Sequence, residues 1–141
     1  MKNLDFEEFY FKGYYKGIAD FSSKRDRELS NWFRGMFNYI NKYYPIKEGK
    51  GKKLIEYGCA TGAAATVLKD YGFDVTSTDI SKYAVKKAQK NYKGIKFLVQ
   101  DMEKPFINGK FDIAVTWYNG RNYIDLIQNS TTWNLVIFEH R

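Results

Sequence analysis

The sequence predicts an α/β domain whose mostly parallel β-sheet carries helices on both faces. From Lys53 onward, short apolar segments alternate with amphipathic segments, and this alternation is typical of parallel strands that are buried on both sides. A turn of small residues with two glycines joins the first apolar segment to the first amphipathic one. The 141 residues suffice for a single domain with its own core.

The N-terminal residues are rich in aromatic side chains and are expected to belong to the same domain. Residues 45–51 (PIKEGKG) combine chain breakers with charges, and they divide an N-terminal helical cap (1–46) from the core (47–141). Residues 5–18 hold six aromatic side chains and are expected to form a cover. Ser23 and Asp26 have the spacing of a helix capping box. The following helix is expected to bury the residues that recur at helical spacing: Leu29, Trp32, Phe33, Met36, Ile40, Tyr43 and Tyr44.

The core is expected to contain five strands and three helices. The strands are predicted over 53–57, 74–78, 95–100, 111–117 and 134–138, and the helices over 63–71, 81–92 and 122–128. Gly72 is expected to end the first of these helices and Ser81 to cap the second. Right-handed crossovers then give a Rossmann-like sheet with strand order 3-2-1-4-5, whose ligand site lies at the carboxyl ends of the strands.

Charge and composition limit the possible surroundings and partners. The net charge is +7 with a pI of about 9.3, and four lysines between residues 47 and 53 indicate either a solvated linker or a strip for nucleic-acid phosphates. No apolar run reaches the ~18 residues of a membrane span, and the N-terminus lacks the apolar core of a signal peptide. With one cysteine and one histidine, neither a disulfide nor a Cys/His zinc site is expected. A cytoplasmic protein without a membrane partner or a bound metal is therefore predicted.

The stretch Leu54–Ala65 (LIEYGCATGAAA) is the most informative segment. Gly58 and Gly62 permit a tight turn, and the small Cys59 and Ala60 let a ligand approach the backbone. The helix that follows offers unpaired N–H groups to an anion. The G-x-x-x-G spacing fits neither the dinucleotide fingerprint nor the P-loop, so a plain strand–helix turn remains an alternative.

Two carboxylates follow the next two strands. Asp79 ends the second strand, where it could bind both hydroxyls of a ribose or cap the next helix. Asp101 and Met102 follow the third strand, where a carboxylate and a backbone N–H could bind an adenine edge, or could belong to an ordinary loop. All these residues are expected at the carboxyl ends of consecutive strands.

The motifs EYGCATG, TSTDIS, FLVQDMEKPF and FDIAVTWY resemble, in series, those of class I S-adenosylmethionine-dependent methyltransferases, over residues 52–118. The resemblance implies that S-adenosylmethionine is the cofactor and assigns it three groups of residues. The ribose and adenine residues are Asp79, Ile80, Asp101 and Met102. The lid candidates are Tyr14 and Tyr15. The residues around the methionine part are Glu56, Gly58, Cys59, Ala60 and Gly62.

The predicted function is methyl transfer to a small molecule, with Tyr118 and Asn119 as candidate substrate residues after the fourth strand. No catalytic residue is assigned. An RNA- or protein-directed methyltransferase and a non-catalytic cofactor-binding module remain alternatives. Family members usually continue into a sixth and a seventh strand, whereas this chain stops at Arg141. The apparent lack of that hairpin predicts an exposed sheet edge and a possible homodimer.

Overall fold

The computed structural model describes residues 23–43, 45, 49–101, 111–117 and 135–139. Its helices are α1 (Ser23–Ile40), α2 (Ala63–Asp70) and α3 (Lys82–Asn91). Its strands are β1 (Lys53–Tyr57), β2 (Asp74–Asp79), β3 (Lys96–Val99), β4 (Ile113–Trp117) and β5 (Leu135–Glu139). The cover expected over 5–18 and the helix expected over 122–128 lie outside the described residues.

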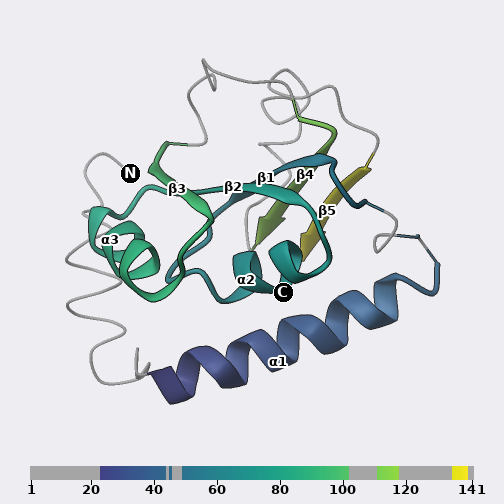
Figure 1. The fold of residues 1–141 in the computed structure, drawn as a ribbon, viewed down its shortest axis with the longest axis horizontal. Helices are drawn as coiled ribbons and strands as arrows, with labels where there is room; N and C mark the ends of the chain where they lie inside the picture. The colour runs from purple at the N-terminus through teal and green to yellow at the C-terminus, as the bar shows by residue number, and fades with distance from the viewer. Residues whose placement is uncertain (1–22, 44, 46–48, 102–110, 118–134, 140–141) are drawn as a thin grey trace.

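The described strands form one sheet in the order β3-β2-β1-β4-β5, and every pairing is parallel. The predicted strand order is confirmed (Figure 1). The chain moves from β1 outward through β2 to β3, then returns to the other side of β1 with β4. The order therefore reverses between β1 and β4, which is where ligands bind in open parallel sheets.

Local signals correctly placed the start of α3 and the end of α2. Ser81 is the N-cap of α3, and its hydroxyl accepts a hydrogen bond from the Ala84 N–H at 3.1 Å. Gly72 follows the end of α2 with a φ of +97°, and its N–H donates to the Lys69 carbonyl at 2.8 Å. Both predicted capping roles are confirmed.

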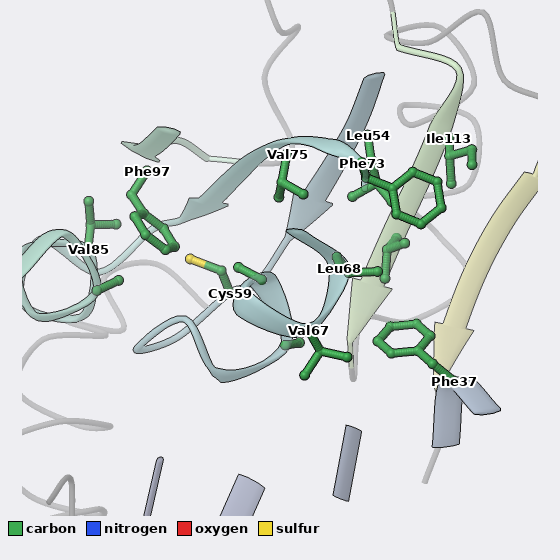
Figure 2. Packing of buried hydrophobic residues seen from close by; sticks show 14 residues of the cluster. Phe37, Leu54, Cys59, Val67, Leu68, Phe73, Val75, Val85, Phe97 and Ile113 are labelled. Atoms are coloured by element: carbon green, nitrogen blue, oxygen red, sulfur yellow. The ribbon is translucent and has the colours of Figure 1, made fainter. Parts of the chain in front are cut away.

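One face of the sheet packs on α2 and α3, and α1 packs on the outer side of α2 (Figures 1 and 2). Leu54 pairs with Val75 and Ile113, so these side chains share the face that contacts α2. Val67 and Leu68 of α2 are fully buried against it. The described helices cover this face only, and the helix predicted over 122–128 for the other face lies outside the described residues. None of the described helices is long and apolar enough to span a membrane.

The α1 helix differs from its prediction in which side chains it buries. Phe37 was not assigned to the apolar stripe, yet it is fully buried, and its ring centroid lies 6.0 Å from that of Tyr71. Trp32 and Tyr43 were expected to be buried but are 47% and 67% exposed. The stripe that contacts the core instead has the i, i+3, i+4, i+7 spacing of Phe33, Met36, Phe37 and Ile40. The helix also ends at Ile40, rather than continuing to Tyr44.

Candidate functional site

The turn between β1 and α2 adopts an unusual backbone conformation. Gly58, Ala60 and Gly62 have φ values of +79°, +47° and +95°, in the left-handed region that favours glycine. The N–H groups of Gly58 and Cys59 both donate to the Thr78 carbonyl, at 2.8 and 2.9 Å. The end of β2 thus holds the first half of the turn against it.

Gly62 is required by its surroundings as well as by its φ. A Cβ atom there would lie 2.9 Å from the Tyr92 ring and 3.0 Å from the Phe97 ring. Gly62 is also the N-cap of α2, and no side chain makes a capping hydrogen bond at this position. No side chain therefore caps the first N–H groups of α2 at the turn. Such a helix start suits a bound anion.

Asp79 connects the turn to the next helix. Its Oδ2 accepts a hydrogen bond from the Ala60 N–H at 2.8 Å, and its Oδ1 accepts one from the Ser81 N–H at 3.0 Å. The alternative that Asp79 caps the next helix is wrong, because Ser81 is the N-cap of α3 and Asp79 bonds to the Ser81 N–H.

The third predicted element lies at the same edge of the sheet. The Gln100 N–H donates to the Asp79 carbonyl at 3.0 Å, so the pairing of β2 with β3 continues directly up to Asp101. Asp101 is half-buried, and Ile80 is 41% exposed beside Asp79. The structure thus brings the glycine turn, Asp79 and Asp101 together at the carboxyl ends of β1, β2 and β3.

Two predicted site residues have buried side chains. Glu56 is fully buried and accepts a hydrogen bond from the Ser77 hydroxyl at 2.7 Å. The Cys59 sulfur points toward Phe97 within the core (Figure 2). Burial raises the pKa of the Cys59 thiol well above its usual value, and the Glu56 and Asp79 carboxylates add to the shift. A thiol in this state is a poor nucleophile, so Cys59 can contribute to a ligand site only through its backbone.

The remaining predicted site residues, Tyr14, Tyr15, Met102, Tyr118 and Asn119, lie outside the described part of the chain. Within the described ranges, no group of three or more His, Cys, Asp or Glu side chains could hold a metal ion.

Sequence reasoning missed a polar contact on the opposite side of the turn. The Thr61 hydroxyl donates to Oδ1 of Asp26 at 2.9 Å, and both residues are buried. Asp26 had been interpreted as part of a capping box, which concerns only its own helix. No local pattern relates residues 35 positions apart, so this contact required the three-dimensional structure.

Solved structures share this fold. A protein of Pyrococcus horikoshii OT3 is 24% identical with a TM-score of 0.64, over 83% of this chain and 57% of its own. Coclaurine N-methyltransferase, solved with N-methylheliamine and SAH, is 16% identical with a TM-score of 0.61, over 77% of this chain and 35% of its own. CalS10, a SAM-bound amino pentose methyltransferase from Micromonospora echinaspora, is 19% identical with a TM-score of 0.51, over 66% of this chain and 39% of its own.

These likenesses show that the chain shares its Rossmann-like fold with these solved proteins. Residues 55–118 match the family model described as a methyltransferase domain, a stretch that runs from the middle of β1 to the end of β4 and contains every described residue of the predicted site. The resemblance inferred from the sequence motifs is thereby confirmed. No curated protein matches the chain. The chain spans only about half the length of the solved proteins that it resembles.

Proposed function

We propose that this protein binds S-adenosylmethionine across the carboxyl ends of β1, β2 and β3 and transfers its methyl group to a small molecule. One observation carries the proposal. The Ala60 N–H is bound to the Asp79 carboxylate at 2.8 Å, which joins the glycine turn to the ribose candidate. A glycine turn followed by a helix, with an acidic residue at the end of the next strand, is the arrangement that Rossmann-like proteins use for adenosine-containing ligands.

The described residues fit the parts of the cofactor. The turn from Gly58 to Gly62 and the uncapped start of α2 supply backbone donors and space for the methionine carboxylate. Asp79 would accept hydrogen bonds from the ribose hydroxyls. The exposed Ile80 side chain would pack against the adenine, and Asp101 would accept from its amino group. Met102 would complete the adenine edge, and Tyr14 and Tyr15 would form a lid.

The chemistry requires position more than acid–base catalysis. The bound cofactor supplies a methyl group that is already electrophilic on its sulfonium. The protein then has to hold the acceptor in line with that methyl and exclude water, which contributes several kcal/mol through orientation. Neither Glu56 nor Cys59 is suited to act as a base, because both side chains are buried in the core. Tyr118 and Asn119 are the proposed substrate-positioning residues.

A small-molecule acceptor is supported by the similar structures. Coclaurine N-methyltransferase holds N-methylheliamine in its crystal structure, and CalS10 is an amino pentose methyltransferase. The motifs here also lack the Asn-Pro-Pro-Tyr type of sequence found in many amino-group DNA methyltransferases. A protein that acts on a dissolved small molecule fits the proposed cytoplasmic location.

An RNA-directed methyltransferase is the second candidate, and α3 favours it. This helix (KYAVKKAQKN) contains no acidic residue, and its exposed Lys82, Lys86 and Lys90 recur every four residues, which places them about 6 Å apart along the helix. Such a row suits a phosphate backbone. RNA binding that weakens steeply with salt, and weakens further when these lysines become glutamines, would favour this candidate. Salt-independent or absent RNA binding would exclude it.

Two further proposals concern the assembly and the activity. A homodimer is proposed because β5 forms an edge of the described sheet, and light scattering at several concentrations tests it.

A non-catalytic module would bind the cofactor but transfer no labelled methyl group to any acceptor in a mixture of small molecules, RNA and protein.

Calorimetric titration of the purified protein tests cofactor binding. S-Adenosylmethionine and S-adenosylhomocysteine should each bind at one site, and NAD should not. S-Adenosylhomocysteine without its ribose hydroxyls should bind about tenfold to a hundredfold more weakly, because hydrogen bonds to a charged group contribute about 1.5–3 kcal/mol.

Asp79→Ala should weaken binding by a similar factor. Asp74→Ala is the matched control, because Asp74 is an exposed aspartate at the other end of β2, and it should bind as the unaltered protein does. Equal binding of the complete and the hydroxyl-free ligand, or equal affinity of the two variants, would refute the assignment of Asp79 to the ribose.

A further inference from the structure

A buried carboxylate joins three elements next to the proposed cofactor site. Asp26 lies in the first turn of α1 and is 4% exposed. Its Oδ1 accepts a hydrogen bond from the Thr61 hydroxyl at 2.9 Å, and its Oδ2 accepts one from the Asn91 side-chain amide at 3.2 Å. Thr61 belongs to the glycine turn, and Asn91 is the last residue of α3.

The turn is therefore bound from two sides. Asp79 holds the Ala60 N–H from the side of β2, and Asp26 holds the next residue, Thr61, from the side of α1. Together the two carboxylates leave the backbone between Gly58 and Gly62 little freedom to rotate.

General stability does not account for Asp26. Docking of α1 on α2 is already provided by the buried Phe37, by the Arg34–Asp70 ion pair at 3.2 Å and by the Tyr71 hydroxyl, which donates to Oδ1 of Asn38 at 3.0 Å. A buried carboxylate is costly to desolvate, and an apolar residue of similar volume would often stabilise helix packing as well or better. The carboxylate of Asp26 is explained if its role is to accept hydrogen bonds from the specific donors Thr61 and Asn91.

We propose that Asp26 is a positioning residue for the cofactor turn, acting through the Thr61 hydroxyl, so that cofactor affinity depends on the hydrogen bond between Asp26 and Thr61. The inference rests on the proposed function, because it assumes that the turn binds the cofactor. Asp26 itself touches neither cofactor nor substrate in this account. Its effect is to keep the backbone donors of the turn in their binding geometry, which reduces the ordering cost that binding would otherwise carry.

Three variants separate positioning from simple packing. Thr61→Val keeps the shape of the side chain but removes the donor to Asp26. Thr61→Ser keeps the donor. Tyr71→Phe removes a hydroxyl that also joins α2 to α1 through a side-chain hydrogen bond, but far from the turn. Each is compared with the unaltered protein by its melting temperature and its calorimetric dissociation constant for S-adenosylhomocysteine.

Thr61→Val should weaken the binding of S-adenosylhomocysteine about tenfold, which corresponds to about 1.4 kcal/mol and is within the usual contribution of one hydrogen bond. The dissociation constants of Thr61→Ser and Tyr71→Phe should stay within about twofold of that of the unaltered protein. This should hold even if Tyr71→Phe lowers the melting temperature as much as Thr61→Val does. Equal affinities of Thr61→Val and the unaltered protein, or an equal loss in Tyr71→Phe, would overturn the proposal.

Amide hydrogen exchange in the cofactor-free protein provides a readout that needs no ligand. The Ala60 and Gly62 amides should exchange about tenfold faster in Thr61→Val than in Tyr71→Phe, because the turn opens locally when one anchor is lost. Unchanged exchange would contradict the positioning role. Failure of the unaltered protein to bind S-adenosylhomocysteine would instead contradict the proposed function, and the exchange rates would still decide whether Asp26 fixes the turn.

Discussion

Individual residues of the turn between β1 and α2 differ in what makes them necessary. Gly62 combines a φ of +95° with a lack of space for a Cβ atom, whereas Ala60 adopts a φ of +47° with a side chain in place. A left-handed conformation costs a non-glycine residue about 1–2 kcal/mol. The turn therefore already accepts some strain at Ala60, but it cannot accept a side chain at Gly62.

Substitution of Gly62 tests this difference. Gly62→Ala should lower the free energy of unfolding by about 2–4 kcal/mol, because left-handed strain adds to the overpacking against Tyr92 and Phe97. Gly51→Ala is the matched control. Its φ is +82° but nothing lies within 4 Å of the added Cβ, so strain alone should cost about 1 kcal/mol. Urea denaturation gives both values, and equal losses would show that the contacts at Gly62 are unimportant.

At the residue scale, sequence position was informative where the contact is local. Asp79 was placed at the end of its strand, and that placement is confirmed. Its hydrogen bond to the Ala60 N–H could not be predicted, because it depends on the left-handed geometry of a turn 19 residues earlier in the chain. The same reason kept Asp26 and Thr61 out of the predicted site.

At the scale of elements, α1 contains one glycine that its surroundings do not require. A Cβ atom at Gly35 would meet nothing within 4 Å. Gly35→Ala should therefore raise the free energy of unfolding by about 0.5–1 kcal/mol, because alanine has the higher helix propensity and restricts the unfolded chain. A lower free energy of unfolding for Gly35→Ala than for the unaltered protein in urea denaturation would contradict this prediction. It would mean that Gly35 is required by its surroundings.

The elements that the structure describes were predictable to within a few residues, but the buried face of α1 was not. Strands and helices of the core follow from the alternation of apolar and amphipathic segments, and Ser81 and Gly72 mark helix ends through local chemistry. In α1, the aromatic residues are spread over nearly half of the helix circumference, which is wider than the face that packs on α2, so periodicity alone did not identify that face. Phe37 was therefore missed, and Trp32 was wrongly expected to be buried.

At the scale of the whole molecule, the parallel order β3-β2-β1-β4-β5 brings three separate motifs to one edge of the sheet. That convergence could be predicted, because parallel strands with right-handed crossovers place their carboxyl ends together. The acceptor of the methyl group could not, because substrate specificity resides in loops whose shape neither composition nor periodicity determines.

The central claim is that an adenosyl group lies across the tips of β1, β2 and β3, and amide chemical-shift mapping of isotope-labelled protein tests it most directly. On addition of S-adenosylhomocysteine, the largest saturable shifts should fall on the amides of Gly58, Ala60, Ile80 and Asp101. The outer face of α1, including Tyr39, should not respond. An absence of saturable shifts, or shifts confined to α1, would contradict the account.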